Sequence, residues 1–282
     1  MKFLRFGDKG QERPGCLDAS GRVRDLSGVA ADFGGEGVAI TALDRLRAID
    51  PETLPLAPEG ARIGCALAFV PNFWAVGLNY ARHAQEAGMA IPQEPILFTK
   101  ATGCLSGPHD PVILPKDSVK SDWEVELGIV IGRDAYHVTE TEAPGCVSAY
   151  CLINDVSERE FQIERGGQWV KGKSAPTFGP VGPWLVTPDE LGDPQAIPLG
   201  MSLNGAVQQD SSTADMIFGV AQIVSYMSRF IALRPGDIIA TGTPEGVGMG
   251  QKPQRFLRPG DVMELWAEGL GRQRQEVVAF PG

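Results

Sequence analysis

The chain has 282 residues, 43% of them apolar and 21% charged, which is typical of a globular protein with one large domain or two small ones. Its formal net charge of −10 argues against nucleic acid or an anionic membrane as the main partner, because both are negatively charged. No apolar run is long enough for a membrane span, and the polar opening MKFLRFGDKGQERPG does not predict a signal peptide. Five cysteines without a CxxC pair predict a reduced, cytoplasmic protein.

The first part of the chain is predicted to form a small N-terminal domain over residues 1–67. Apolar residues at helical spacing predict a helix over Ala39–Ile49. The Pro-rich, acidic segment 50–64 is typical of a linker. We therefore place a domain boundary near residue 67 and assign residues 68–282 to a second, larger domain.

The second domain is predicted to be rich in strands. FWAVGL (Phe73–Leu78) is a candidate strand, NYARHAQEAG is a short helix that ends at Gly88, and EPILFTKA and PVILP are further short strands. The segment LRPGD occurs twice, before Ile238 and before Val262, and each copy predicts a tight turn that leads into a strand. Many short strands with few helices predict a β-rich α+β fold.

Two longer helices are also expected. Ser157 with Glu160 forms a capping-box pattern, which predicts a helix that ends at the glycine pair Gly166 and Gly167. The segment Thr213–Ala232 places its apolar residues on one stripe, so it is the best candidate for an amphipathic helix.

The run SDWEVELGIVIG contains an unusual concentration of acidic residues. Read as a strand, it sends Asp122, Glu124 and Glu126 to one face, and the run contains no Lys or Arg. A solvent-exposed strand face would explain this pattern, and so would a divalent cation bound by the carboxylates. The apolar stretch Ile129–Ile131 favours the cation, because carboxylates that enter a core need a partner.

Four further motifs carry candidate chemistry. Asp155 ends the apolar run AYCLIND, either as a turn residue near a helix start or as a functional carboxylate at a strand end. His83 and Glu86 share a helix face, either as a surface ion pair or as a base with its orienting carboxylate. The lysines of VKGKS are most simply solvated charges, and ATGTPEGVG offers backbone NH groups that can cradle an anion.

Together these motifs resemble those of the fumarylacetoacetate hydrolase family. DxExE, NDxSxRxxQ, GKS and TGTPxGVG occur in this order, with NYxxHxxE upstream, over roughly residues 70–270. The resemblance implies a mixed β-sheet roll with few helices, a small N-terminal domain, a catalytic domain over 68–282 and a homodimer.

The resemblance also implies roles for individual residues. Glu124, Glu126 and Asp155 match the family's ligands for one Mg²⁺ or Mn²⁺ ion, and Asp122 matches an acid that lies behind them. His83 and Glu86 match the pair that activates water, and Lys173 matches a lysine that stabilises negative charge. The positions that match substrate-binding residues are Arg159, Gln162 and Thr243.

The implied reaction is hydrolysis of a C–C bond in a 2,4-dioxo acid, which gives pyruvate and a second acid. Val76 stands where fumarylacetoacetate hydrolases carry a further metal-binding Asp, and the aromatic clasp for fumarylacetoacetate is not evident. The opening segment and residues 157–191 look more like the branch that acts on 2,4-diketo-3-deoxy sugar acids, although Ala175-Pro176 replaces a Cys-Asp pair of that branch.

A hydroxylated substrate tail is also suggested by the polar motif residues, which include Gln168 and Lys171. No stretch beside the motifs clearly supplies an apolar wall. An acylpyruvate hydrolase, an oxaloacetate decarboxylase, an isomerase or tautomerase of an oxo acid, and a non-catalytic binding protein remain the alternatives.

Overall fold

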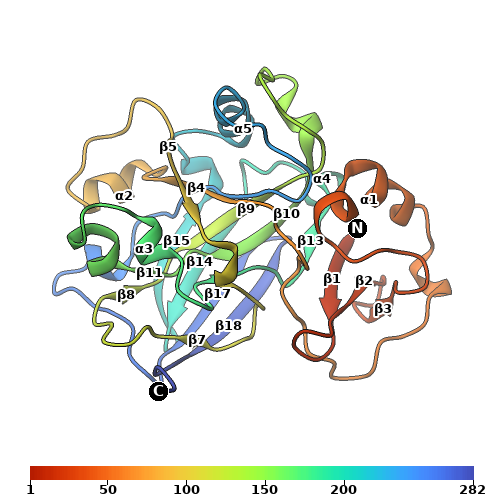
Figure 1. The fold of residues 1–282 in the computed structure, drawn as a ribbon, viewed down its shortest axis with the longest axis horizontal. Helices are drawn as coiled ribbons and strands as arrows, with labels where there is room; N and C mark the ends of the chain where they lie inside the picture. The colour runs from red at the N-terminus through yellow and green to blue at the C-terminus, as the bar shows by residue number, and fades with distance from the viewer.

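Two β-sheets form the body of the protein in a computed structural model that describes residues 1–282 (Figure 1). The first sheet contains β1 (Lys2–Phe6), β2 (Arg13–Leu17), β3 (Val23–Asp25), β4 (Phe73–Gly77), β5 (Ile96–Lys100), β9 (Val125–Ile131), β10 (Val147–Asn154), β13 (Leu185–Val186) and β16 (Ile238–Ala240). The second contains β7 (Val112–Ile113), β14 (Pro198–Leu203), β15 (Ala206–Ser212), β17 (Val262–Ala267) and β18 (Gly271–Val278). Two short pairs join β6 (Leu105–Ser106) to β12 (Gly179–Pro180) and β8 (Ser121–Asp122) to β11 (Ser157–Glu158).

The helices are short and lie outside the sheets (Figure 1). They are α1 (Ile40–Arg47), α2 (Ala81–Glu86), α3 (Val170–Lys173), α4 (Pro188–Leu191), α5 (Val220–Ser228) and a π-helix over Glu160–Glu164. Single 3₁₀ turns occupy Gly35–Val38, Pro51–Thr53, Thr102–Cys104, Ala143–Cys146, Thr213–Asp215 and Gly248–Gly250. None of the helices has the length and apolarity that crossing a bilayer requires. The β-rich α+β fold predicted from the sequence is confirmed.

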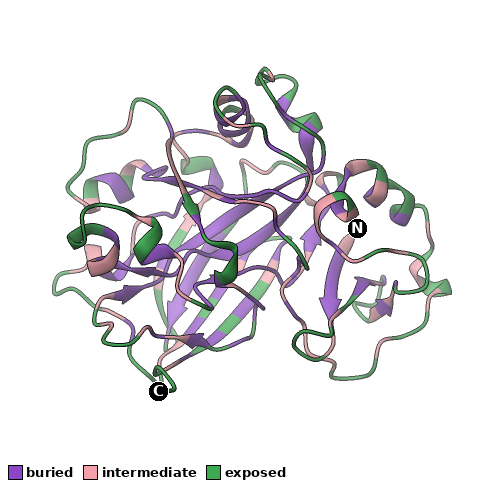
Figure 2. Ribbon diagram, viewed as in Figure 1, coloured by how far each residue is buried: buried purple, intermediate pink, exposed green.

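Strands β9 and β10 form the centre of the protein. The first sheet has the order β3-β2-β1-β13-β10-β9-β16-β4-β5, and the second has the order β15-β14-β17-β18-β7. Every residue of β9 and β10 is buried, because the second sheet packs across them through β14, β17 and β18 (Figure 2). Such doubly covered strands read as continuous apolar runs, as IVI in β9 does.

The N-terminal segment extends the first sheet rather than forming a separate one. β1 pairs with β13 through Lys2 and Phe3, and β2 and β3 follow outward (Figure 1). Segment 50–64 runs along these strands, with Asp25 donating its backbone NH to Pro55 and Ala57 donating to Val23. The helix expected over Ala39–Ile49 is α1. The domain boundary near residue 67 remains a prediction.

The two LRPGD turns form as predicted. The NH of Asp237 donates to the Arg234 carbonyl and that of Asp261 to the Arg258 carbonyl, both at 3.0 Å. The glycines in these turns have φ of 87° and 91°, values that favour glycine. Strands β16 and β17 start directly after them.

The long helix predicted over Thr213–Ala232 is wrong at both ends, because α5 covers only Val220–Ser228. The segment before it contains the 3₁₀ turn Thr213–Asp215 and then pairs with residues 79 and 80. Ile217 donates its NH to the Asn79 carbonyl, and Phe218 donates to the Asn79 side chain. Long-range pairing therefore overrides the helical apolar stripe of residues 216–218.

Two other local predictions fail for a similar reason. The capping-box helix does not begin at Ser157, because Ser157 pairs with Asp122 in the β8–β11 pair, and the hydroxyl of Ser157 donates to the Asp155 carbonyl. The acidic run is not one continuous strand, since it is interrupted between β8 and β9 at Trp123 and Glu124. This break separates Asp122 from the face that Glu124 and Glu126 share.

Candidate active site

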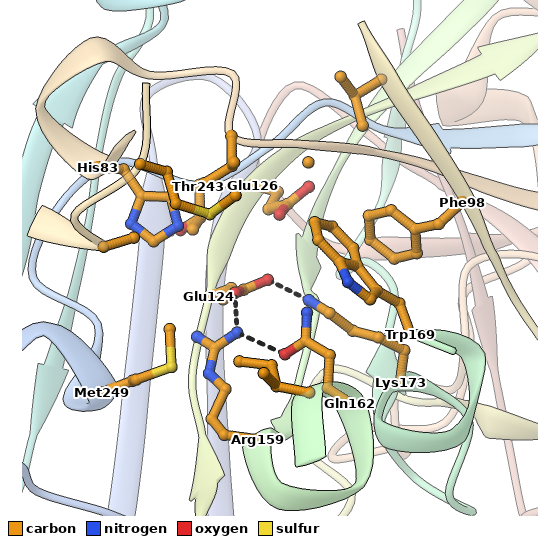
Figure 3. Close-up of a pocket in the computed structure, with 16 residues that line it drawn as sticks. His83, Phe98, Glu124, Glu126, Arg159, Gln162, Trp169, Lys173, Thr243 and Met249 are labelled. Atoms are coloured by element: carbon orange, nitrogen blue, oxygen red, sulfur yellow. Dashed lines mark hydrogen bonds and ion pairs between the residues drawn. The ribbon is translucent and has the colours of Figure 1, made fainter. Parts of the chain in front are cut away.

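A cavity of about 170 Å³ lies beside the start of β9, between β4, α2, α3 and the loop after β16 (Figure 3). It contains seven of the predicted site residues, namely His83, Glu124, Glu126, Arg159, Gln162, Lys173 and Thr243. Asp155 and Glu86 are not part of its lining but contact lining residues. The structure thus brings together the nine residues for which the resemblance implies metal-binding, catalytic or substrate-binding roles.

Three buried carboxylates form the core of the site. Glu124 directly precedes β9, Glu126 is the second residue of β9, and Asp155 directly follows β10. Because β9 and β10 are antiparallel, with Val125 opposite Asn154, Asp155 lies opposite Glu124 and donates its backbone NH to the Glu124 carbonyl. One oxygen from each of Glu124, Glu126 and Asp155 lies within 4.8 Å of the others.

Buried cations surround these carboxylates. The Nζ atom of Lys173 lies 2.5 Å from Glu124 Oε2 and 2.7 Å from Asp155 Oδ2. The Nη1 atom of Arg159 lies 2.7 Å from Glu124 Oε1 (Figure 3). Lys173 lies in α3 and is buried, which contradicts its simplest interpretation as a solvated loop charge.

Lys100 is a site residue that the sequence analysis missed. Its Nζ atom donates to Asp155 Oδ1 at 2.5 Å and to the Val156 carbonyl at 3.3 Å, and its side chain is fully buried. Lys100 is the last residue of β5, and only the pairing of β5 with β4 brings it to the site. The sequence does show a single lysine at the end of an apolar strand, which indicates a functional or buried charge. It does not show which carboxylate that lysine pairs with.

The charges of the cluster shift the pKa values of Glu124 and Glu126 in opposite directions. Burial opposes ionisation of Glu124, but Lys173 and Arg159 outweigh burial and hold the pKa of Glu124 well below its usual range. Burial and the negative charges of Asp155 and Glu124 raise the pKa of Glu126 well above its usual range. The one hydrogen bond that Glu126 accepts comes from the Gly242 NH, at 2.7 Å.

This donor set fits a divalent cation. Hard cations such as Mg²⁺ and Mn²⁺ prefer carboxylate oxygens, and Glu126 is a buried carboxylate with no cation paired to it. A metal ion at Glu124, Glu126 and Asp155 would supply the missing positive charge.

His83 and Glu86 lie on α2, the short helix predicted from the sequence. Nδ1 of His83 lies 3.4 Å from Glu86 Oε2, and His83 is buried at the cavity wall. The two oxygens of Glu86 accept from the Gly246 NH at 3.0 and 3.2 Å. The loop after β16 therefore fixes the carboxylate that faces the histidine.

The NH groups of the loop ATGTPEGVG do cradle anions, and these anions are carboxylates of the chain itself. Gly242 donates to Glu126, Gly246 to Glu86 and Gly248 to Asp122. Asp122 also accepts from Arg159 Nε at 2.8 Å, so it links the arginine to this loop.

The predicted substrate-binding side chains are largely engaged within the protein. Thr243 donates its hydroxyl to the Val125 carbonyl at 3.0 Å, and the amide of Gln162 accepts from Arg159 at 3.1 Å. Lys171 is exposed and donates to the Arg165 carbonyl, and neither Lys171 nor Gln168 lines the cavity. The expectation that both contribute to a polar pocket is wrong.

Replacing Gly246 with Ala is expected to lower the free energy of unfolding by about 2 kcal/mol or more. Gly246 has φ of 98°, and a Cβ there would lie 1.9 Å from the Gln208 carbonyl oxygen. Chemical denaturation measures the loss, and Gly28→Ala is the matched control because a Cβ at Gly28 meets nothing. An unchanged midpoint for Gly246→Ala would contradict the role of this loop.

Replacing Lys100 with Met is expected to lower the free energy of unfolding by about 3 kcal/mol, because it leaves Asp155 with one fewer cation in a buried site. Lys171→Met, at an exposed lysine, should change stability by less than about 0.5 kcal/mol. Equal stability of the two variants in urea would show that Lys100 is not needed to neutralise the cluster.

Comparisons with known proteins agree with this architecture. Residues 72–278 match the family described as the C-terminal domain of fumarylacetoacetate (FAA) hydrolase. A Burkholderia cenocepacia protein named as a hydrolase is 54% identical over 276 residues, which is 98% of each chain. A structure named fumarylacetoacetate hydrolase, from Exiguobacterium antarcticum, is 35% identical with a TM-score of 0.89 and 99% coverage of both chains.

A second kind of name occurs among the similar structures. A Mycobacterium abscessus protein described as a 2-hydroxyhepta-2,4-diene-1,7-dioate isomerase is 32% identical, with a TM-score of 0.83 and 99% coverage of both chains. The family match covers most of the chain and the relatives align over nearly all of it. The chain therefore belongs to the fumarylacetoacetate hydrolase family.

Proposed function

We propose that the protein is a metal-dependent hydrolase that cleaves a C–C bond in a 2,4-dioxo acid and releases pyruvate and a second acid. The observation that supports this most is the shared cavity: Glu124 and Glu126 of the carboxylate cluster and His83, with Glu86 behind it, reach the same space. The family and the hydrolase names of its relatives support the general class.

Glu124, Glu126 and Asp155 would hold one Mg²⁺ or Mn²⁺ ion. When bound, the ion would act as a Lewis acid towards the 2-oxo acid end of the substrate. Lys173 and Lys100 stabilise the negative charges of Glu124 and Asp155, and Lys173 also reaches the cavity. In this position Lys173 would stabilise negative charge that develops on the substrate.

His83 is proposed as the general base. Its Nδ1 faces Glu86, so Nε2 remains for a water molecule in the cavity. His83 would take a proton from this water, the water oxygen would attack the C4 carbonyl, and the C3–C4 bond would break. The pyruvate enolate then takes up a proton, and C4 leaves as a carboxylic acid.

Arg159, Gln162 and Thr243 are proposed as substrate-binding residues. Arg159 fixes the Gln162 carbonyl oxygen, which leaves the Gln162 NH₂ group as a donor to the substrate. Thr243 also lines the cavity, and its hydroxyl, which donates to the Val125 carbonyl and accepts from Gln209, keeps one lone pair for the substrate.

Isomerisation of an unsaturated oxo acid is the second candidate, because similar structures carry isomerase names. This reaction and decarboxylation of oxaloacetate need a stabilised enolate but no attack by water. Neither reaction would therefore use the His83–Glu86 pair to activate water.

The test is an assay with Mg²⁺ or Mn²⁺ on acetylpyruvate, a 2,4-diketo-3-deoxy sugar acid, oxaloacetate and a 2-hydroxydienoate. Pyruvate is measured by a coupled lactate dehydrogenase reaction, and the second acid by mass spectrometry in H₂¹⁸O. Hydrolysis predicts one ¹⁸O atom in the carboxylate of the second acid. Release of CO₂ would show decarboxylation instead of hydrolysis, and a double-bond shift without pyruvate would show isomerisation. Binding of these compounds without turnover would contradict the proposal that the protein is an enzyme.

A cytoplasmic location and a homodimer also remain proposals, drawn from composition and from the family resemblance. Light scattering after size-exclusion chromatography should give twice the mass of 30.1 kDa for the dimer. A mass of one chain would contradict it.

A further inference from the structure

Half of the 16 residues that line the cavity are apolar, contrary to the expectation that no stretch supplies an apolar wall. Six of them form what is called the apolar wall below, namely Val76, Leu78, Met89, Phe98, Ile163 and Trp169. These residues come from β4, β5, the segments after β4 and α2, and the π-helix to α3 region. Because segments far apart in the sequence build it, no single motif shows it.

Phe98 and Trp169 form the aromatic part of this wall. Their ring centroids lie 5.1 Å apart at an interplanar angle of 65°, an edge-to-face arrangement (Figure 3). Trp169 lies directly against β4 at Gly77, where a Cβ would come within 2.4 Å of the indole ring. The glycine therefore creates the space that the indole occupies.

The apolar wall begins next to the charged cluster. The Nζ atom of Lys173 lies 5.2 Å from the centroid of the Phe98 ring. Figure 3 shows both aromatic rings on the Lys173 side of the cavity, with His83 and Met249 across from them. A substrate whose acid end binds at the charged cluster thus has apolar surface available for its other end.

Apart from the NH₂ group of Gln162, few polar groups of the lining are free to bind hydroxyls on that end. All three guanidinium nitrogens of Arg159 lie within 3.1 Å of Asp122, Glu124 or Gln162, although Nη2 is buried at its ion pair with Asp122 without a hydrogen bond. Thr243 donates to the backbone, and Lys173 is paired with two carboxylates. A hydroxylated tail would lose hydrogen bonds to water without full replacement, whereas an apolar tail would gain burial.

We propose that the preferred substrate carries an apolar, preferably aromatic, substituent on the C4 carbonyl, and that Trp169 with Phe98 determines this specificity. The proposal rests on the proposed function for the reaction, but the recognition of the tail is a separate property of the cavity. It replaces the hydroxylated tail suggested by the motifs.

The test compares three 2,4-dioxo acids that differ in the tail, namely phenyl, methyl and the hydroxylated sugar chain. With Mg²⁺ or Mn²⁺, we expect kcat/KM for the phenyl compound to exceed that for the other two by about tenfold or more. Calorimetric Kd values, measured with the same metal, should follow the same order. Equal or better cleavage and binding of the methyl or sugar compound overturns the proposal.

Substitutions in the apolar wall then test which side chains cause the preference for an apolar tail. Trp169→Ala should reduce kcat/KM for the phenyl compound about tenfold more than for the methyl compound, and Trp169→Phe should restore part of the difference. Val170→Ala is the matched control, because Val170 neighbours Trp169 but does not line this cavity. If Trp169→Ala does not fold, Phe98→Leu tests the same wall. A preference unchanged in the folded variants overturns the role of these rings.

Failure of the two proposals is distinguishable. If no dioxo acid yields pyruvate, the proposed reaction is wrong, but the Kd values still decide whether the cavity prefers an apolar tail. If all three yield pyruvate with similar kcat/KM, the reaction stands and the tail preference is wrong.

Discussion

Replacing Glu126 with Gln is expected to weaken binding of Mg²⁺ or Mn²⁺ strongly and to lower turnover by roughly 10³-fold. Glu126 is the carboxyl group of the cluster that pairs with no lysine or arginine, so its oxygens are the ones most available to a cation. A neutral amide keeps the shape of the side chain but cannot ionise when the cation binds. Metal binding is measured by calorimetry, and turnover after treatment with chelator and restoration of metal.

The matched control is Glu158→Gln, which changes another buried glutamate outside the cluster. Glu158 accepts from the Lys120 NH, and the amide oxygen of Gln can do the same. This variant should bind metal like the unmodified chain. Full activity of Glu126→Gln without metal would refute the proposed metal site, and so would wild-type activity in excess chelator.

His83→Ala is expected to retain metal binding and to lose turnover by roughly 10²–10⁴-fold. The histidine lines the cavity but is separate from the cluster of Glu124, Glu126 and Asp155. Its removal should therefore affect proton transfer from water and not the affinity for the cation. The two quantities are measured on the same preparation.

His137→Asn is the control for this variant. His137 is exposed and has φ of 55°, a conformation that Asn tolerates well. A loss of metal affinity in His83→Ala would show that the histidine belongs to the metal site. Unchanged turnover would exclude it as the base.

Local sequence signals worked where the physical cause is itself local. The turns before β16 and β17 formed as predicted, because Pro fixes one φ angle and Gly accepts the positive φ that follows. Helix α2 formed as predicted, and Gly88 behind it has φ of 68°. These features need no information about distant parts of the chain.

Local signals failed where a distant segment offered backbone partners. No helix begins at Ser157, because Ser157 pairs with Asp122 instead. The apolar stripe before α5 does not form a helix, because its backbone makes hydrogen bonds with Asn79. Helix propensities amount to tenths of a kcal/mol per residue, so buried long-range pairing easily overrides them.

The sequence alone determined the residue types of the site, their order along the chain and the family that they resemble. It could do so because the chemistry of carboxylates, histidine and lysine belongs to the side chains themselves. Only the tertiary structure decided which charges meet. Lys100 reaches Asp155 because β5 pairs with β4, and Asp122 lies outside the cavity lining of Glu124 and Glu126, in a strand separate from β9. The apolar wall around Trp169 was decided in the same way, since a surface built from separate segments exists only after they have packed together.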